Sequence, residues 1–206
     1  MTGRQINPAV LLLILAFSGL TACGNEQQLP PLADTATILA FGDSLTRGYS
    51  VGSEDSYPAI LQKLVNRTVV NAGVSGEESA DGLKRLPALL DQHDPDLMIL
   101  CHGGNDILRK RDIGKMAANV KAMISLASDR KIPVVLLAVP EPGIFLSPSP
   151  VYRDIADATN VIMIGDLIPG ILGKANLKSD SVHPNKAGNR VMAEEIYRVL
   201  QKSGAI

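Results

Sequence analysis

The stretch Ile38-Leu39-Ala40-Phe41-Gly42-Asp43-Ser44-Leu45 decides the fold. A short apolar run that ends in glycine predicts a strand followed by a tight turn into a helix. Four more short apolar runs come later in the chain, separated by helical patterns. Strands are expected at residues 38–41, 68–71, 96–101, 133–139 and 161–164. Helices are expected at 57–65, 77–90, 115–127, 151–158 and 186–201. This alternation predicts the α/β class, with a five-stranded parallel sheet covered by helices on both faces.

The order of the strands determines which segments meet. In the flavodoxin-like order 2-1-3-4-5, the first and third strands are neighbours at the point where the chain reverses direction across the sheet, and ligands bind there. This order places Ser44 beside Asn105, with Gly73 on the other side of Ser44. The segment Ser75-Gly76-Glu77-Glu78 has the spacing of a capping box, which predicts a helix start just after Gly73.

Four segments of the sequence carry chemistry. They are Gly42-Asp43-Ser44-Leu45, Asn71-Ala72-Gly73, Gly103-Gly104-Asn105-Asp106 and Asp180-Ser181-Val182-His183. Together they contain a hydroxyl, an imidazole, a carboxylate and amide donors, the parts of a serine hydrolase. The predicted roles are nucleophile for Ser44, base for His183, orienting carboxylate for Asp180, and oxyanion donors for Ser44, Gly73 and Asn105. Each segment taken alone also fits an ordinary turn or helix cap.

Two residues compete for these roles. Ser50 lies in Gly48-Tyr49-Ser50-Val51-Gly52, which fits the G-x-S-x-G elbow of another hydrolase class. That elbow requires a strand directly before it, whereas a helix start is expected there. His102 is the competing base, and we expect it to line the site or to lie in the core.

The chain resembles the SGNH hydrolases, also called GDSL esterases. Ser44, Gly73, Asn105 and His183 fall on the four named blocks of that family, and Asp180 is the carboxylate three residues before the histidine. The resemblance runs from about residue 38 to the last helix. It implies a three-layer α/β/α fold, the activity of a serine esterase and no cofactor.

Three longer phrases resemble one branch of this family, the multifunctional acyl-thioesterases, lysophospholipases and arylesterases. These phrases are Gly42-Asp43-Ser44-Leu45-Thr46-Arg47-Gly48-Tyr49, Leu86-Pro87-Ala88-Leu89-Leu90 and Asp180-Ser181-Val182-His183-Pro184-Asn185. The branch implies a shallow, mobile site for aryl esters, acyl thioesters or lysophospholipids. Residues 77–79 are a candidate adjusting loop, and residues 140–146 a candidate apolar wall. An envelope carbohydrate O-acetylesterase and a non-catalytic, lipid-anchored binding protein are the alternatives.

Residues 1–22 are typical of an export signal. Arg4 supplies a positive charge, an apolar core spans residues 10–17, and small residues close the segment. This core is shorter than the roughly 20 residues that a membrane-spanning helix needs. Its ending, Leu20-Thr21-Ala22-Cys23, resembles the lipobox of bacterial lipoproteins, which implies cleavage before Cys23, acylation of Cys23 and anchoring to a membrane. An ordinary secretory signal cut near Ala22 is the alternative.

The remaining chain divides into a tether and one domain. Residues 23–36 are predicted to form a flexible tether because the run at residues 24–31 is polar and contains prolines. Residues 37–206 are predicted to form one hydrolase domain. The expected location is the bacterial cell envelope, lipid-anchored and facing the extracytoplasmic, periplasmic side.

Composition narrows the range of partners. The 20 basic and 21 acidic residues nearly balance, so nucleic acid is not expected as a partner. The three histidines, His93, His102 and His183, have no zinc-binding spacing, so no metal is expected. With Cys23 lipidated, Cys101 has no disulfide partner and is expected to be a small buried hydrophobe. An ester substrate, the membrane at the anchor and a monomeric chain complete the expectations.

Overall fold

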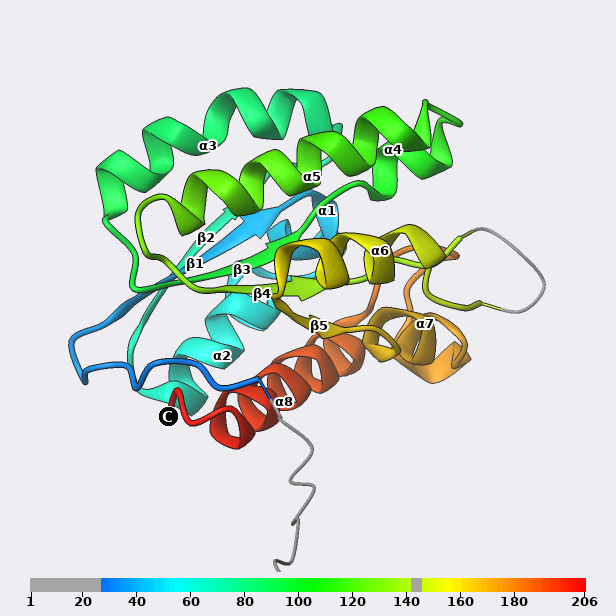
Figure 1. Cartoon of the computed structure of the whole chain (residues 1–206). Helices are drawn as coiled ribbons and strands as arrows, with labels where there is room; N and C mark the ends of the chain where they lie inside the picture. Colours follow the sequence, from blue (N-terminus) through cyan, green and yellow to red (C-terminus); the bar gives the residue numbers. More distant parts are fainter. Residues whose placement is uncertain (1–26, 142–145) are drawn as a thin grey trace, which may run out of the picture.

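The computed structural model describes residues 27–141 and 146–206 (Figure 1). Its five strands pair in parallel in the order β2-β1-β3-β4-β5, which confirms the predicted 2-1-3-4-5 topology. The strands are β1 Thr37–Gly42, β2 Thr68–Gly73, β3 Leu97–Cys101, β4 Val134–Leu137 and β5 Ile162–Ile164. Every predicted strand is present, with its ends shifted by no more than two residues.

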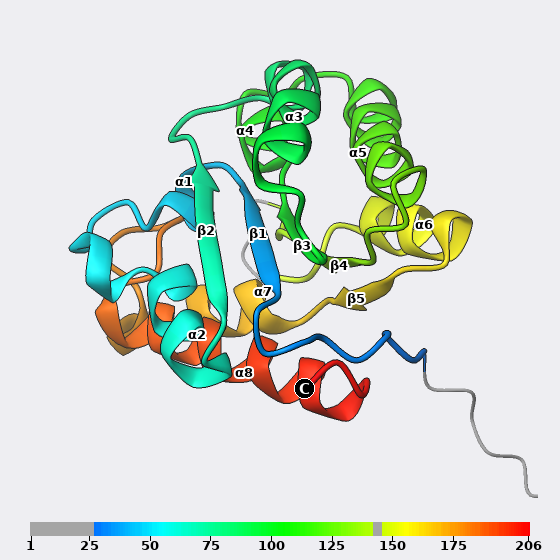
Figure 2. The ribbon, with the colours of Figure 1, turned by 90° about the vertical axis from the view of Figure 1, so that its left-hand side faces the viewer.

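Helices cover both faces of the sheet, so the three-layer α/β/α arrangement is also confirmed. Figures 1 and 2 show α3 and α5 on one face, and α2 and α8 on the other. The helices are α1 Ser44–Arg47, α2 Tyr57–Val65, α3 Ser79–His93, α4 Gly104–Leu108, α5 Ile113–Ser128, α6 Pro150–Thr159, α7 Leu167–Leu172 and α8 Lys186–Lys202. No helix in the described residues is both long enough and apolar enough to cross a membrane.

The core lies on both sides of the central strands. Every residue of β3 and β4 is buried, because these strands have a neighbour on each side and helices above and below. Two buried tyrosines reach polar partners. The hydroxyl groups of Tyr57 and Thr46 lie 3.1 Å apart, and the Tyr152 hydroxyl donates to the His102 carbonyl at 2.7 Å. Cys101 is fully buried, as predicted.

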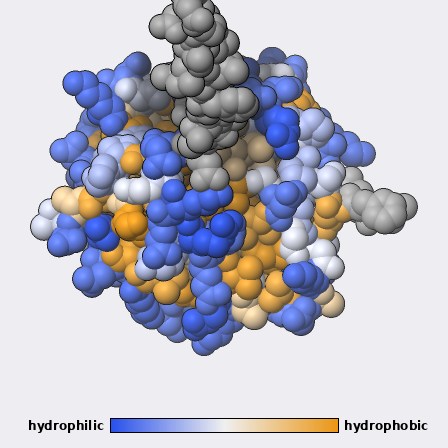
Figure 3. All heavy atoms as spheres, turned by 60° about the horizontal axis from the view of Figure 1, so that its bottom comes forward, coloured by the Kyte–Doolittle hydropathy of each residue, from blue (hydrophilic) through white to orange (hydrophobic). Residues whose placement is uncertain are grey.

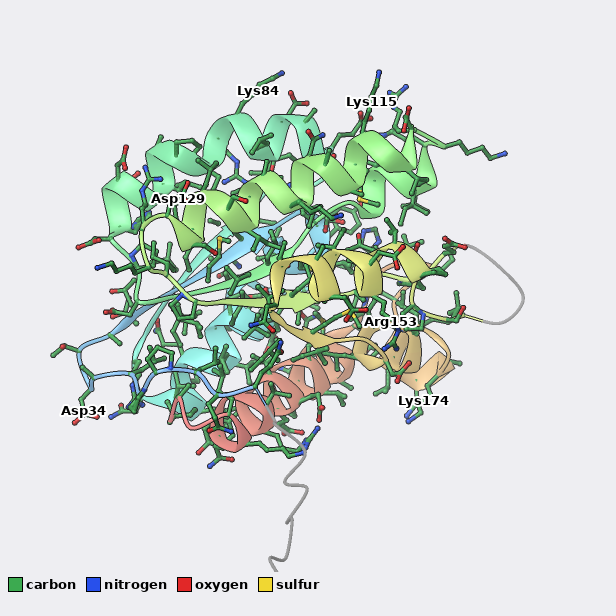
Figure 4. All side chains as sticks on the ribbon, viewed as in Figure 1. Asp34, Lys84, Lys115, Asp129, Arg153 and Lys174 are labelled. Carbon is green, nitrogen blue, oxygen red and sulfur yellow. The ribbon has the colours of Figure 1, made fainter. Side chains whose placement is uncertain are left out.

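Most charged side chains lie on the outside, and Asp43 and Asp106 are buried exceptions. Figure 4 shows the labelled Lys84, Lys115 and Asp129 pointing away from the sheet on the outer layer of α3 and α5. The face at the bottom of Figure 1, turned forward in Figure 3, mixes hydrophilic and apolar side chains. The side chains labelled in Figure 4 include both acidic and basic residues on the outside of the molecule.

The predicted start of α3 is wrong. The helix begins at Ser79, and Glu78 occupies the N-cap position without a side-chain cap. The Val74–Glu77 segment forms a turn instead, in which the Glu77 N–H donates to the Val74 carbonyl at 3.2 Å. Gly76, the third residue of this turn, has φ +79°, a conformation that favours glycine. The capping-box spacing is thus accidental.

The predicted tether is wrong in its second half. The N–H groups of Leu29 and Leu32 donate to the carbonyls of Ser203 and Ala205, at 2.9 and 2.8 Å. The Leu32 side chain is buried, and the Arg67 guanidinium donates to its carbonyl. Residues 29–36 are therefore part of the domain. The predicted signal, residues 1–22, and Cys23 lie outside the described residues.

Gly42→Ala should destabilise the fold. A Cβ on Gly42 would collide with the Cys101 carbonyl and with the Thr46 hydroxyl. We expect the free energy of unfolding, measured by urea denaturation, to fall by about 1–3 kcal/mol, the usual cost of overpacking. Gly170→Ala is the control, because nothing lies within 4 Å of its Cβ position. It should leave stability unchanged or raise it by up to about 1 kcal/mol. Equal stability in the two variants would contradict this packing argument.

Candidate active site

Ser44 lies where three parallel strands end together. Gly42, at the end of β1, is in register with Gly73 on β2 and with Cys101 on β3. The chain then turns into α1, and the Asp43 carboxylate caps this helix by accepting the Leu45 N–H at 3.0 Å. Ser44 is the first residue of α1, so the sharp turn holds its side chain at the edge of the sheet.

The structure brings Ser44, His183 and Asp180 together. The His183 Nε2 lies 3.0 Å from the Ser44 Oγ, and the His183 Nδ1 lies 2.7 Å from the Asp180 Oδ2. An ionised carboxylate only accepts hydrogen bonds, so Nδ1 carries the proton and Nε2 is left to accept from the serine hydroxyl. Nucleophilic catalysis by a serine requires this arrangement of a nucleophile, a base and a group that orients the base.

The loop that carries the imidazole is held by its own hydrogen bonds. The Asp180 Oδ1 accepts the N–H groups of Val182 and His183, each at 2.8 Å. Partial burial raises the pKa of the Asp180 carboxyl. The two N–H groups and the imidazole lower this pKa by more than burial raises it, so it lies below the usual value. The carboxylate therefore stays ionised beside the imidazole.

Tyr49 is a site residue that sequence reasoning missed. Its ring centroid lies 4.6 Å from that of the His183 imidazole, and the two rings are tilted by 42°. Tyr49 follows α1 and is about half exposed, so it covers one side of the imidazole at the mouth of the site. Its place beside a residue 134 positions later depends on the tertiary fold.

Asn105 lies in the site as predicted, but its amide is already engaged. Its Nδ2 donates to the Glu77 carbonyl at 3.0 Å and to the Asp43 Oδ2 at the longer distance of 3.3 Å. Asp43 is almost completely buried. Burial raises the pKa of its carboxyl, and the nearby His102 and the Leu45 N–H offset only part of that rise. Asp43 thus positions both α1 and Asn105.

The prediction for Gly73 is wrong. Its N–H donates to the Asn71 Oδ1 at 3.0 Å, and its Cα faces the backbone of Arg47 in α1. Gly76, three residues later, lines the pocket together with Ser44 and Asn105. Among the described residues, no hydrogen bond uses the Gly76 N–H. The sequence signal for Gly76 was a glycine at the third position of a turn, which the capping-box interpretation concealed.

A pocket of about 220 Å³ opens beside the Ser44 hydroxyl. Its walls are mostly apolar: Leu45, Leu108, Val139, Pro140, Ile168, Leu172 and Val182. Of the predicted wall at residues 140–146, Pro140 lines the pocket, and residues 142–145 lie outside the described residues. Ile168 and Leu172 come from α7, a short helix that the sequence analysis did not predict.

The two competing residues lie elsewhere. Ser50 follows α1 in a turn with φ +74°, has no strand directly before it and is not among the residues that line the pocket. His102 is fully buried, and its Nε2 lies 3.1 Å from the Glu77 Oε2. His102 is therefore a core residue, and its carboxylate partner is Glu77. Among the described residues, no three histidine, cysteine or acidic side chains form a group that could hold a metal ion.

Residues 77–79, predicted as an adjusting loop, are held firmly. The Glu77 carboxylate accepts from the Arg85 guanidinium at 2.6 and 2.8 Å, and Glu78 pairs with Arg109 and Arg111. The Ser79 side chain is buried and donates to Asp106 at 2.7 Å. Ion pairs and hydrogen bonds therefore fix this segment beside the pocket.

Comparisons with known proteins agree with this geometry. Residues 40–191 match the GDSL-like lipase/acylhydrolase family. The chain is 32% identical to an arylesterase of Vibrio mimicus, over 93% of this chain and 98% of that protein. It is 29% identical to the esterase TesA of Pseudomonas aeruginosa, over 88% and 96%. A crystal structure of TesA superposes with a TM-score of 0.75 at 30% identity, over 81% of this chain and 99% of that chain. The esterase EstA from Pseudoalteromonas, inhibited by monoethylphosphonate, superposes with a TM-score of 0.74 at 29% identity, over 81% and 97%.

The Glu77 carboxyl should make stability depend on pH. Burial raises its pKa, but hydrogen bonds from His102 and Arg85 and the Arg85 charge lower it more, to about 2. Because the folded pKa lies below the ordinary value, the stabilisation is complete above about pH 4.5 and is lost as pH falls towards 2. In urea unfolding between pH 5 and 2.5, Glu77→Gln should lose less stability than wild type. Glu54→Gln, which removes an exposed carboxyl, should follow wild type. Parallel curves for wild type and Glu77→Gln would contradict the expectation.

Proposed function

This chain belongs to the GDSL-like lipase/acylhydrolase family and is a serine ester hydrolase, and we propose that it prefers aryl esters and thioesters with short acyl chains. The observation that carries the mechanism is the hydrogen-bonded series from Ser44 through His183 to Asp180 at the mouth of an apolar pocket. It joins a hydroxyl, a base and an orienting carboxylate beside a place for the acyl group.

The reaction proceeds in two acyl-transfer steps. The Ser44 Oγ attacks the ester carbonyl carbon while the His183 Nε2 takes the hydroxyl proton. The tetrahedral intermediate collapses, its bond to the leaving group breaks, and the imidazolium returns the proton to that group. Water, deprotonated by His183, then attacks the acyl-serine, and a second collapse releases the acid and restores Ser44. Asp180 keeps the imidazole in the required tautomer throughout.

One of the three predicted oxyanion donors changes, because Gly76 takes the place of Gly73. We assign this role to the N–H groups of Ser44 and Gly76 and to the Asn105 Nδ2. Ser44 stands at the first position of a helix, where the N–H has no intrahelical partner. The Asn105 Nδ2 is held by the Glu77 carbonyl at 3.0 Å, and its second hydrogen, which meets Asp43 only at the longer distance of 3.3 Å, is the one offered to the oxyanion.

The pocket supports a preference for short acyl chains. Its volume of about 220 Å³ lies below the roughly 300–1,000 Å³ that is usual for small-molecule pockets. Apolar side chains also surround the mouth, since Tyr49, Val74 and Leu108 are each at least 43% exposed. Tyr49 and Leu108 line the pocket, and Val74 directly precedes the lining residue Ser75. These apolar surfaces suit an aryl or alkyl leaving group.

We further propose that the enzyme is lipid-anchored through Cys23 at the extracytoplasmic side of the bacterial cell envelope. The support is the sequence Leu20-Thr21-Ala22-Cys23 after an apolar signal core. Three residues separate Cys23 from Gln27, where the described chain begins, and these four Cα-to-Cα steps span at most about 14 Å. An acyl group on Cys23 therefore holds the domain close to the membrane surface.

Hydrolysis of p-nitrophenyl esters from acetyl to palmitoyl tests the proposed activity. The chain from residue 24 keeps the whole described core, which lies between Leu29 and Ile206. We expect the highest kcat/KM for butyrate or hexanoate, and loss of activity in Ser44→Ala. Ser50→Ala is the matched control and should remain active. Full activity in Ser44→Ala would reject the nucleophile, and a maximum at palmitate would reject the short-chain preference.

Asn105→Ala should lower kcat by about a hundredfold or more, the effect of losing one oxyanion donor. KM should change little, because this donor acts in the transition state. Steady-state kinetics with p-nitrophenyl butyrate measures both values, and the thermal midpoint reports whether the variant is folded. An unchanged kcat in the folded variant would remove Asn105 from the mechanism.

A further inference from the structure

The proposed oxyanion donors lie on two separate segments of the chain. Gly76 belongs to the turn that follows β2, and Asn105 belongs to α4, which follows β3. An oxyanion hole requires both donors at a fixed spacing before the substrate arrives, because preorganisation is the source of its effect. A buried contact between these two segments is therefore a candidate for the device that sets the spacing.

Such a contact exists directly beneath the donors. The His102 Nε2 lies 3.1 Å from the Glu77 Oε2, and Glu77 directly follows Gly76. On its other side, the imidazole accepts the Gly103 N–H through Nδ1 at 3.1 Å, two residues before Asn105. Because Nδ1 accepts, the hydrogen of the neutral ring is on Nε2 and is donated to Glu77. The ring thus joins the two segments.

Glu77 links the site to the core, because its backbone carbonyl and its side-chain carboxylate have different partners. Its carbonyl accepts from the Asn105 Nδ2 at 3.0 Å, while its carboxylate is held in the core by Arg85 and His102. Arg85 is itself fixed, since it donates to the Ala72 carbonyl and lies 4.5 Å above the Phe41 ring. A displacement of Glu77 would therefore disturb the position of Asn105 relative to Gly76.

Helix α3 leaves space for the histidine. A Cβ on Gly82 would collide with the His102 Nε2, and a glycine inside a helix is less favourable than alanine. Gly82 thus weakens α3 but leaves the space that the His102 imidazole occupies. The contact between His102 and α3 leaves no room for the ring to move sideways towards the helix.

We propose that His102 and Glu77 are positioning residues that fix the spacing between the Gly76 N–H and the Asn105 amide, and thereby set kcat. This inference rests on the proposed esterase mechanism. The imidazole is fully buried and does not line the pocket, so it touches no substrate. Removing its hydrogen bond should weaken the stabilisation of the transition state and leave the binding of the ground-state ester unchanged.

Three substitutions at His102 separate its two hydrogen bonds. His102→Gln places an amide N–H near the position of Nε2 and retains the donor to Glu77. His102→Asn places an acceptor near Nδ1 and retains the bond from Gly103, but it does not reach Glu77. His102→Leu removes both bonds. With p-nitrophenyl butyrate, we expect kcat to fall tenfold or more in the Leu and Asn variants, with KM within about twofold, and to stay within about threefold of wild type in the Gln variant.

Gly82→Ala tests the same contact without changing the histidine. The added methyl group displaces the ring, so kcat should fall as in His102→Leu. Asp81→Ala, at the exposed neighbouring position of α3, is the matched control and should leave kcat unchanged.

A second measurement distinguishes positioning from a loss of stability. Butylboronic acid forms a tetrahedral adduct with an active serine, and one of its oxygens occupies the oxyanion position. Its inhibition constant should rise in proportion to the loss of kcat/KM across these variants. A lower thermal midpoint with unchanged kcat and inhibition constant at 25 °C would overturn the positioning role, as would full activity in His102→Asn. A wild-type enzyme without Ser44-dependent hydrolysis would instead overturn the proposed function, and this inference with it.

Discussion

The parallel pairing of β1 with both β2 and β3 is the constraint on which the rest of the site depends. It brings Gly42, Gly73 and Cys101 to the same level of the sheet, so the three segments that follow these strands emerge side by side. Glycine is required at two of these positions. A Cβ on Gly42 would collide with the Cys101 carbonyl of β3, and a Cβ on Gly73 would collide with the backbone of α1. Because of this register and these glycines, Ser44, the turn with Gly76, and Asn105 lie close together at the carboxyl edge of the sheet.

Buried carboxylates supply much of the order around the pocket. Asp43 caps α1 and also accepts from Asn105, and Glu77 links the turn after β2 to Arg85 and His102. Unpaired charges are costly to bury, and each of these carboxylates meets donors that offset the cost. The partly exposed Asp180 instead relies on the backbone of its own loop. In the described part of the chain, the Asp180 carboxylate accepts hydrogen bonds only from residues of this loop, and its role is to orient the His183 imidazole.

The sequence errors have a common physical cause. The spacing of Ser75 and Glu78 fits a capping box, but the Glu78 carboxylate pairs with Arg109 and Arg111 instead, and the helix starts only at Ser79. That misplaced helix start also concealed Gly76 and left Gly73 as the apparent donor. The proline-containing segment at residues 29–36 looked like a tether because its partners, near Ser203 and Ala205, lie at the far end of the chain. Local patterns carry no information about such distant partners.

Local sequence patterns were enough to predict the α/β class, the strands and most helices, the strand order, and the identities of Ser44, Asp180 and His183. Apolar periodicity and glycine positions are local properties, and the loop with Asp180 and His183 is a short segment whose geometry follows from its own residues. The tertiary structure alone decided that Gly76 and not Gly73 faces the pocket, that Tyr49 covers the imidazole, and that His102 is paired beneath the site with Glu77. Each of these facts depends on the packing of elements distant in the chain, because burial and competition among hydrogen-bond partners are settled only when the sheet and its helices are assembled.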